Sequence, residues 1–399
     1  MRYLTAGESH GPMLLGILEG LPAGIPLEAA FINRYLARRQ GGYGRGGRQK
    51  IEKDEVRIVA GVRHGETLGS PLGFLLENRD FAHWQGVMDP EREARDEEKA
   101  ARRAVKEPRP GHADLVGGLK YDRADLRDIL ERASARETAM KVALGAAALR
   151  FLEELDIHVA GYVVAMGEAA MDPAELEALS FWERRERAAG SPVYCPSPRA
   201  SEAMVEAVRE AARRNDTLGG VVEVMAVGLP VGLGSHIAAE RRLEGRLAAA
   251  LMALPAVKGV EVGLGFGAAY RYGSQVHDAI YREAEARRKG GYTRSTNRAG
   301  GLEGGITNGM PLVVRLAMKP LSTLTHPLPT VNIVTKEPSR AAVERTDVAA
   351  VPALSVVAEA AVGLVLADAV LEKFGGDSLK EVKRNLEGFL AQMEAHPSP

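Results

Sequence analysis

The sequence predicts an α+β fold in which a layer of buried helices lies between antiparallel sheets. Segments rich in β-branched and apolar residues occur in pairs, and the first pair, at residues 4–9 and 13–19, is joined by a three-residue turn. Such close spacing favours antiparallel pairing over a parallel sheet. Two long segments, at 125–155 and 353–374, carry runs of Ala, Leu and Val with few charges, as helices buried on most sides do. A helical layer between sheets would bury both of them.

The other elements follow between these segments in chain order. An amphipathic helix is predicted over residues 27–39, and paired strands are predicted over 56–62 and 72–76. The charged run 89–107 mixes both signs and predicts a solvated helix. Further strands are predicted at 157–166, 221–229, 260–266 and 312–318, and further helices at 201–214 and 238–253.

Length and composition predict one large domain. A chain of 399 residues could hold two or three average domains, but no segment is at once long, rich in Pro or Ser and free of apolar periodicity. We therefore expect a single domain over residues 1–392 and a frayed tail over residues 393–399.

The charge balance argues against nucleic acid and membrane partners. The chain has 52 Lys and Arg against 53 Asp and Glu, so any strong positive charge is local. The most apolar long segment, 353–371, is interrupted by Glu359 and Asp368, and we expect no membrane-spanning helix. The N-terminus shows no cleavable signal pattern, and the single cysteine, Cys195, cannot form an intrachain disulfide. Both observations predict a cytoplasmic setting.

An arginine- and glycine-rich segment follows the first predicted helix. Residues 34–48 contain five arginines and five glycines in fifteen residues. Glycine allows sharp bends and close approach to a ligand, and arginine presents a planar fork of donors that suits carboxylate and phosphate. The segment predicts a mobile loop that closes over a small, highly anionic substrate. A plain surface loop and an RNA-binding tail are the alternatives.

Two histidines lie in glycine-flanked turns, where a side chain can face a ligand. His10 stands in Gly7-Glu8-Ser9-His10-Gly11, and His112 stands in Arg109-Pro110-Gly111-His112-Ala113-Asp114. Histidine can give or take a proton near neutral pH, which makes both residues candidate acids or bases, although a structural role is the commoner one. Neither has the HxxxH or CxxC spacing of a metal site, and we expect no metal.

Several further segments suit anionic ligands. Ser134 and Glu137 have the spacing of a capping box, and the flanking Arg132 and Arg136 would make that helix start an anion site. The glycine cluster 300–309 can present backbone N–H groups, and the Lys-Pro-Leu-Ser-Thr segment 319–323 adds a cation and two hydroxyls, as a phosphate tail requires. The glycines at 263–267 lack the spacing of a dinucleotide fingerprint, which excludes a Rossmann site.

Eight segments, taken in order, resemble the successive signature segments of the chorismate synthase family. The similarity runs from Gly7 to about Glu359, nearly the whole chain. The segments read GESHG, RRQGGYGRGGR, RPGHADL, RASARETA, AVKGVE, AGGLEGGITNG, KPLST and RTDVAAVPA.

This resemblance implies a carbon–oxygen lyase acting on a phosphate ester, at the last step of the shikimate pathway for aromatic amino acids. The family converts 5-enolpyruvylshikimate-3-phosphate into chorismate by a trans-1,4-elimination that needs reduced FMN, although the overall reaction is redox neutral. The resemblance also implies a β-α-β sandwich assembled as a homotetramer. The chain contains no flavin reductase domain that we can identify, so we expect a separate source of reduced FMN, with NADPH only as the ultimate reductant.

The resemblance assigns roles to particular residues. His10 would protonate the departing phosphate, His112 would protonate or polarise the reduced flavin near N1 and the C2 carbonyl, and Asp347 would handle the proton at or through flavin N5. Substrate would be held by Arg39, Arg45, Arg48, Arg136 and Arg345, although the positions of Arg39 and Arg45 are also assigned to NADP in the family. FMN would contact Arg132, Ala133, Ser134, Pro255, Ala256, Gly304, Lys319, Pro320, Leu321, Ser322, Thr323 and Arg345.

The chain departs from the family pattern at three of these segments. Leu321 stands where a threonine is common, Arg298 where a histidine is frequent, and Pro255 where an asparagine is frequent. Leu321 and Pro255 therefore lack the hydroxyl and the amide that the family pattern would offer to FMN. An NADPH- or flavin-dependent oxidoreductase acting on an anionic metabolite is the alternative function, and its net redox change would distinguish it.

Overall fold

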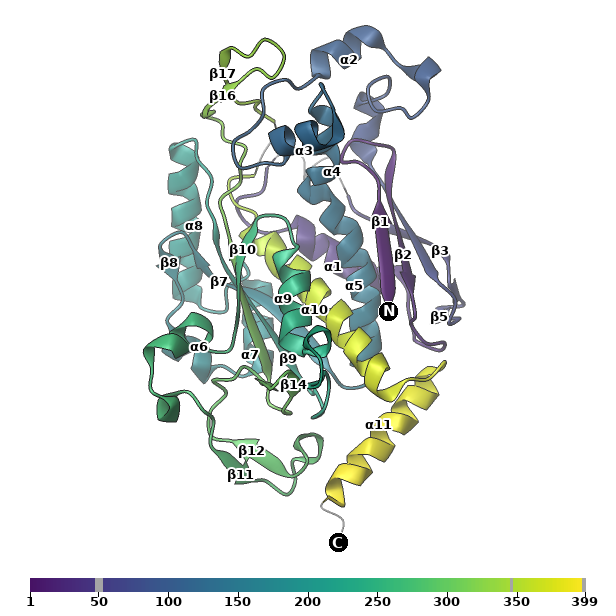
Figure 1. The fold of residues 1–399 in the computed structure, drawn as a ribbon, viewed down its shortest axis with the longest axis vertical. Coiled ribbons are helices and arrows are strands. Elements are labelled where there is room, and N and C mark those ends of the chain that lie inside the picture. Colours follow the sequence, from purple (N-terminus) through teal and green to yellow (C-terminus); the bar gives the residue numbers. More distant parts are fainter. Residues whose placement is uncertain (47–52, 345–346, 397–399) are drawn as a thin grey trace.

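Two antiparallel sheets lie on either side of a group of long helices in the computed structural model of this chain (Figure 1). The structure describes residues 1–46, 53–344 and 347–396. The first sheet has the strand order β1-β2-β6-β3 and the second the order β10-β15-β9-β7-β8. Every pairing in both sheets is antiparallel. The predicted α+β class with antiparallel sheets is therefore confirmed.

The N-terminal sheet forms as predicted. β1 (Arg2–Ala6) pairs with β2 (Met13–Glu19) in a hairpin, and β3 (Val56–Ala60) pairs with β6 (Leu72–Glu77). β1 ends three residues earlier than expected, at Ala6, so that residues 7–12 form the turn. His10 lies in this turn, at one end of the sheet.

The second sheet also follows the predicted strands, with one correction. β7 (His158–Met166), β9 (Gly220–Val227) and β15 (Leu312–Met318) match the expected segments within a few residues. β10 spans Val257–Val262 and does not extend over 263–266. Gly263 has φ +58°, and a Cβ there would lie 2.2 Å from the Arg298 carbonyl oxygen, so the chain leaves the sheet at this glycine.

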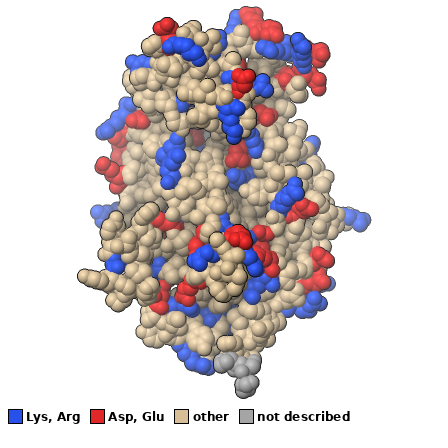
Figure 2. All heavy atoms as spheres, viewed as in Figure 1, with Lys and Arg blue, Asp and Glu red and all other residues tan. Residues whose placement is uncertain are grey.

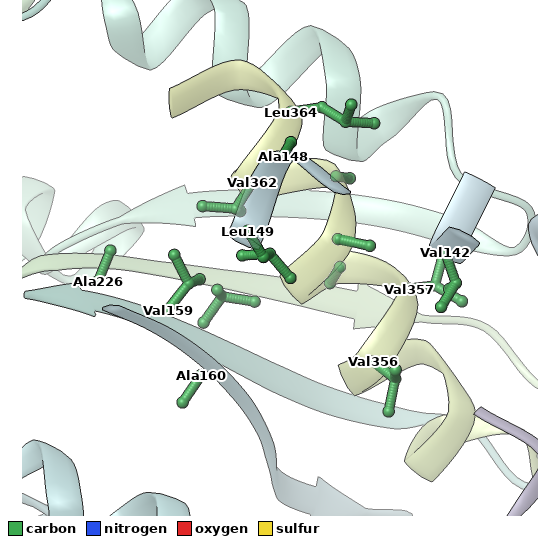
Figure 3. Packing of buried hydrophobic residues seen from close by; sticks show 14 of the residues in the cluster. Val142, Ala148, Leu149, Val159, Ala160, Ala226, Val356, Val357, Val362 and Leu364 are labelled. Carbon is green, nitrogen blue, oxygen red and sulfur yellow. The ribbon is translucent and has the colours of Figure 1, made fainter. Parts of the chain in front are cut away.

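Helices α5 (Thr138–Glu153) and α10 (Val351–Phe374) pack closely against each other and against the sheets. A Cβ at Gly145 of α5 would lie 2.5 Å from the Cβ of Ala360 in α10, so glycine is needed for this approach. Gly16 of β2 faces Met140 of α5, and Gly161 of β7 faces Ser355 of α10. Figure 3 shows side chains from α5, α10, β7 and β9 gathered in one apolar cluster.

The helix predicted over 125–155 is interrupted. α4 (Arg127–Ala133) ends at Ser134, a 3-10 turn covers Ala135–Glu137, and α5 follows. The Ser134 hydroxyl accepts from the backbone N–H of Arg136, not from that of Glu137. Ser134 therefore caps this turn, but not through the expected capping box with Glu137, because the tight turn brings a nearer N–H to the serine.

α10 also corrects an expectation. α10 has 24 residues, and its most apolar 18-residue window has a mean hydropathy of 2.1. Its length and composition would therefore suffice to cross a bilayer, whereas the sequence led us to expect no such helix. However, 83% of that window is buried inside the protein. Glu359, at its centre, is 1% exposed and is paired with Arg38 at 2.9 Å. These contacts are those of a core helix.

The remaining elements surround this core. The charged run 89–107 is α-helical only over α2 (Glu97–Arg103), which is exposed as predicted, and it also contains a short 3-10 helix over Arg92–Ala94. A C-terminal helix, α11 (Leu379–Glu394), was not predicted and continues two residues into the segment expected to fray. The other helices are α1 (Ala29–Gln40), α3 (Asp114–Tyr121), α6 (Pro173–Ala178), α7 (Phe181–Gly190), α8 (Pro198–Arg213) and α9 (Leu243–Met252). The short strands are β4 (Val62–Arg63), β5 (Glu66–Thr67), β8 (Ala169–Ala170), β11 (Ile280–Arg282), β12 (Tyr292–Arg294), β13 (Leu302–Glu303), β14 (Ile306–Thr307), β16 (Pro329–Val331) and β17 (Pro338–Arg340).

Candidate active site

The C-terminal end of α1 places Arg39 in a buried polar cluster. The Arg39 side chain, 4% exposed, donates from Nε to Thr138 Oγ1 at 3.0 Å and from a terminal nitrogen to the Ala135 carbonyl at 2.8 Å. Its other terminal nitrogen lies 3.4 Å from Asp54 Oδ2. The helix end and the 3-10 turn before α5 therefore fix this guanidinium together.

Arg136 meets the same carboxylate. It pairs with Asp54 Oδ1 and donates from Nε to Asn78 Oδ1 at 2.9 Å. Burial lowers the pKa of Arg39 to about 10. The negative charge of Asp54 acts against this decrease, and the positive charges of Arg45 and Arg136 add to it. Arg39 is still protonated at neutral pH, so two buried cations share one carboxylate, and the excess positive charge favours an anionic ligand.

Arg45 and Asp347 bring the glycine-rich segment to this cluster. Arg45 pairs with Asp347 Oδ2 at 2.9 Å, and the backbone N–H of Gly46 donates to Asp347 Oδ1 at 2.6 Å. Arg45 Nε is buried and has no hydrogen-bond partner among the described residues. Two other predicted substrate residues, Arg48 and Arg345, lie outside the described residues.

A cavity of about 630 Å³ borders the glycine-rich segment. It lies between this segment and α8. Val348 also lines the cavity, and its N–H donates to the Gly44 carbonyl at 2.8 Å. The cavity is lined by Gly42, Tyr43, Gly44, Arg45, Gly46, Val208, Arg209, Ala212, Arg213 and Val348.

His10 is held between two carboxylates and an indole ring. Its Nδ1 lies 2.9 Å from Glu131 Oε1, and its Nε2 lies 3.9 Å from Asp80 Oδ2. The imidazole stacks on Trp84 with ring centroids 4.0 Å apart. Asn78 connects this turn to Arg136, since its amide nitrogen also donates to the Gly11 carbonyl at 2.7 Å. His10 and the arginine cluster therefore belong to one continuous polar network.

His112 lies in a second polar cluster at the start of α3. Its Nδ1 lies 2.5 Å from Asp114 Oδ1, and Arg109 donates from Nε to Asp114 Oδ2 at 2.8 Å. Burial alone would raise the pKa of Asp114, but the hydrogen bonds and charges of His112 and Arg109 hold it well below its usual range. Asp114 is therefore an anion that orients the ring of His112.

The segment 319–323 lies against the turn that carries His112. Lys319 Nζ donates to the Gly111 carbonyl, and Arg109 donates to Thr323 Oγ1 at 2.8 Å. The backbone N–H of Lys319 donates to the Ala256 carbonyl at 2.9 Å, which brings Pro255 and Ala256 to the same place. Of the flavin residues expected in this segment, Leu321 and Ser322 are partly exposed and Pro320 is exposed.

The two clusters are linked by the residues that lead into β9. Just before this strand, Thr217 Oγ1 donates to the Leu321 carbonyl at 2.7 Å, and the N–H of Leu218 donates to the Val348 carbonyl at 2.9 Å. Because Val348 follows Asp347 directly, the segment 319–323 and the pair Arg45–Asp347 are neighbours.

The break between α4 and α5 carries three of the expected flavin residues. The exposed Arg132 donates to the Thr5 and Gly7 carbonyls of the N-terminal sheet at 2.9 and 3.1 Å. Ala133 and Ser134, next to it, are partly exposed. These residues lie beside the turn that carries His10.

Gly304 is the one described candidate that the structure does not bring to the others. It lies in the β13–β14 turn, before β15 begins, whereas Lys319 follows the end of β15. A seven-residue strand spans about 20 Å, so Gly304 lies at the opposite end of the sheet from the segment 319–323. Arg298 is also at that end, where its carbonyl accepts from the N–H of Leu264 at 2.9 Å.

Several residues of the site were not predicted from the sequence. Asp114 could have been found, because it stands two residues after His112, and Glu131 could have been suspected from its place just before Arg132. No local signal marks Asp54, Asn78 or Trp84. Among the described residues, no three His, Cys, Asp or Glu side chains gather as a metal site would require.

Comparison with known proteins identifies the family. Residues 1–371 match the sequence model of the chorismate synthase family. The chain is 58% identical over 390 residues to a chorismate synthase of Moorella thermoacetica, covering 98% of each chain, and 56% identical over 395 residues to one of Symbiobacterium thermophilum, covering 98% of this chain and 99% of the other. A solved crystal structure of chorismate synthase matches with TM-score 0.78 at 42% identity, covering 99% of this chain and 98% of that chain. The chain therefore belongs to the chorismate synthase family, whose members are lyases.

Proposed function

We propose that this chain catalyses the trans-1,4-elimination of phosphate from 5-enolpyruvylshikimate-3-phosphate to give chorismate. The observation that carries the proposal is the polar network that runs from Arg39 and Arg136 through Asn78 to the turn that carries His10, with the charges of Arg45 and Asp347 close enough to act on Arg39. It combines buried cations with a histidine that can donate a proton, on a chain of this family. The substrate has two carboxylates and one phosphate, and the network offers several guanidinium groups to them.

The arginines bind and orient the substrate. Arg39 and Arg136 are held rigid by Asp54, Thr138 and Asn78, so little side-chain entropy is lost when an anion binds. Arg45 has a buried Nε that has no partner among the described residues, and an anionic oxygen would supply one. We propose that Arg48 and Arg345 complete this set.

His10 donates a proton to the departing phosphate. Glu131 accepts from Nδ1–H, so the imidazolium form of His10 gives its Nε2 proton to a phosphate oxygen and is left neutral, with its remaining proton on Nδ1. Protonation matters because phosphate leaves poorly as a trianion. Asp347 acts as the proton acceptor of the reaction, and Arg45 holds its carboxylate in place.

The second cluster fits a flavin phosphate and ring. Lys319, Ser322 and Thr323 offer one ammonium and two hydroxyls on a single turn, and His112 lies against that turn. We propose that this segment, Pro255, Ala256 and the exposed side of residues 132–134 hold reduced FMN, and that His112 stabilises charge on it. When bound, the reduced flavin supplies electron density to the substrate ring. Gly304 is too distant to join this site from the same chain.

The finer points of the assignment rest on the family resemblance. We propose that the layers of sheet, helix and sheet are the β-α-β sandwich of the family, that residues 1–392 form the domain, and that four copies assemble. We also propose a cytoplasmic enzyme that takes reduced FMN from a separate reductase. NADPH then acts only as the ultimate reductant, and Arg39 and Arg45 contact substrate and not NADP.

An anaerobic assay tests the proposal. The purified chain is mixed with the enolpyruvyl substrate and chemically reduced FMN, and phosphate and chorismate are measured together. We expect both products in equal amounts, with no reaction if FMN stays oxidised. The alternative, an NADPH- or flavin-dependent oxidoreductase, is not favoured by relatives that are named chorismate synthases, and it would consume one reductant per product.

A further inference from the structure

We propose that Glu131 is a positioning residue that fixes the tautomer and the orientation of His10. The inference rests on the proposed role of His10 as the acid for phosphate departure. Glu131 touches neither of the proposed ligand groups directly and acts only through the histidine.

Glu131 binds the turn that carries His10 at three points. Its two carboxylate oxygens lie 2.9 and 3.0 Å from His10 Nδ1, and one of them also accepts the backbone N–H of His10 at 2.8 Å. The main-chain carbonyl of Glu131 accepts the N–H of Ser9 at 3.0 Å. The last turn of α4 therefore holds both the ring and the backbone of the hairpin turn, which Asn78 also holds through the Glu8 and Gly11 carbonyls.

The state of the carboxylate decides which ring nitrogen carries the proton. Burial would raise the pKa of Glu131, but hydrogen bonds from His10 and the charges of His10 and Arg127 lower it below its ordinary value. Glu131 is therefore ionised at neutral pH and can only accept. A neutral His10 must then keep its proton on Nδ1, and Nε2 is left as the atom that exchanges a proton with a ligand.

The other neighbours of the ring fix its plane. Trp84 stacks on the imidazole at 4.0 Å between centroids, with an angle of 24° between the planes, and His10 is 13% exposed. Arg103 and Arg127 lie over the Trp84 ring at 4.0 and 4.8 Å. Arg127 also pairs with Glu131 at 3.0 Å, so the indole and the carboxylate are braced by the same guanidinium. The ring can turn neither about its long axis nor away from Glu131 without breaking a contact.

The test combines Glu131→Gln with His10→Ala. Glutamine has the same shape, but its NH₂ group would face either the ring Nδ1–H or the backbone N–H of His10, so one contact is lost. We expect kcat to fall by about tenfold to a hundredfold with KM for the substrate nearly unchanged, as when partners that orient functional histidines are removed. In the His10→Ala background, Glu131→Gln should have no additional effect on kcat.

Glu223→Gln is the matched control. Glu223 is 1% exposed and, like Glu131, accepts from several partners, here Tyr162, Arg184 and Arg315, in the second sheet and far from His10. We expect this variant to lose stability but to keep its kcat. NMR of the imidazole nitrogens in the whole enzyme, with ¹⁵N-labelled histidine and His10→Ala for assignment, should show the Nδ1–H tautomer for neutral His10.

The outcomes distinguish a failure of the proposed role of His10 from a failure of the proposed role of Glu131. Full turnover in His10→Ala would overturn the proposed acid and the inference with it. A large loss in His10→Ala with unchanged turnover in Glu131→Gln, or with losses that add in the double variant, would overturn the inference alone. An Nε2–H tautomer in the unmodified enzyme would also overturn it, and this measurement needs no variant of Glu131 that folds.

Discussion

Replacing Asp54 with asparagine should destabilise the ligand-free protein more than it destabilises the substrate complex. Asp54 is 4% exposed and is the carboxylate between Arg39 and Arg136, which are 4% and 6% exposed. Asparagine keeps the shape, but its NH₂ group must face one of the two guanidinium groups. Two buried positive charges would then lie close together without a counter-charge between them.

The expected cost follows from removing one partner of a buried ion pair. Such a change costs about 3–5 kcal/mol when the remaining charge stays buried. We therefore expect the free energy of unfolding of Asp54→Asn to fall by about 3 kcal/mol or more in urea denaturation followed by circular dichroism. Adding the enolpyruvyl substrate, or inorganic phosphate as a simpler anion, should recover more stability in the variant than in the unmodified protein, because the anion supplies the missing negative charge.

Asp156→Asn is the control for this experiment. The Asp156 side chain is 80% exposed, and its one ion pair among the described residues is with His158, at 3.1 Å. Removing its charge should therefore lower the free energy of unfolding by about 1 kcal/mol or less. An Asp54→Asn variant that unfolds at the same urea concentration as this control would contradict the account of the arginine cluster. Equal stabilisation of variant and unmodified protein by the anion would contradict the placement of the anion beside Arg39 and Arg136.

Four other predictions follow from the same geometry. Arg45→Ala should raise KM for the substrate about tenfold or more, since a charge-assisted hydrogen bond is worth about 1.5–3 kcal/mol. Arg187→Ala on the surface of α7, away from the cavity, should not raise it. His112→Ala should lower kcat by about 10²–10⁴ in activity assays, and it should also lower the melting temperature in calorimetry, because the buried Asp114 loses one of its partners. Substrate should tighten FMN binding by about 1–3 kcal/mol in a fluorescence titration, and equal FMN affinity with and without substrate would show that the sites are independent. The pKa of Asp114 is lower in the folded protein than its unfolded value of about 3.9, so the pairing of Asp114 stabilises the fold above that pH. This stabilisation is lost as the pH falls further, toward the folded pKa. In Asp114→Asn, urea titrations at decreasing pH should therefore show a smaller loss of stability than in the unmodified protein.

Local patterns predicted most of the elements, because strands and helices are encoded in short windows. The hairpin around His10 and the buried helix α10 were predicted for this reason. The failures occur where a single residue ends an element. Gly263 turns the chain out of β10, and Ser134 interrupts the helix before α5. α11 was missed although Ser378 and Glu381 form a capping box that the sequence contains.

Partners that are distant in the sequence could not be predicted. The segment 34–48 was interpreted as a loop that closes over an anion, and nothing in it distinguished Arg38, which forms a bidentate pair with Glu359, 321 residues away in the sequence. The same pair explains a glutamate in the middle of α10, which the sequence shows only as an interruption of an apolar run. Glu359 also accepts the N–H of Gly161 at 3.0 Å, so its charge is satisfied within the core.

Surface charge followed more directly from composition. Figure 2 shows Lys and Arg interspersed with Asp and Glu over the face in view, as a formal net charge of −1 suggests. Among the described cations of the proposed site, Arg39 and Arg136 are instead buried and Arg45 is largely buried, and only their position next to Asp54 and Asp347 distinguishes them from the many surface arginines. Composition therefore predicted that the positive charge is local, but not where it is concentrated.

The number of products formed per reduced flavin tests the central claim most directly. The enzyme is mixed anaerobically with a small, known amount of chemically reduced FMN and a large excess of the enolpyruvyl substrate, without NADPH, and released phosphate is counted. A redox-neutral elimination predicts many phosphates and many chorismates per FMN, with the flavin still reduced at the end. One product per flavin, accompanied by stoichiometric flavin oxidation, would contradict the account and identify the chain as an oxidoreductase.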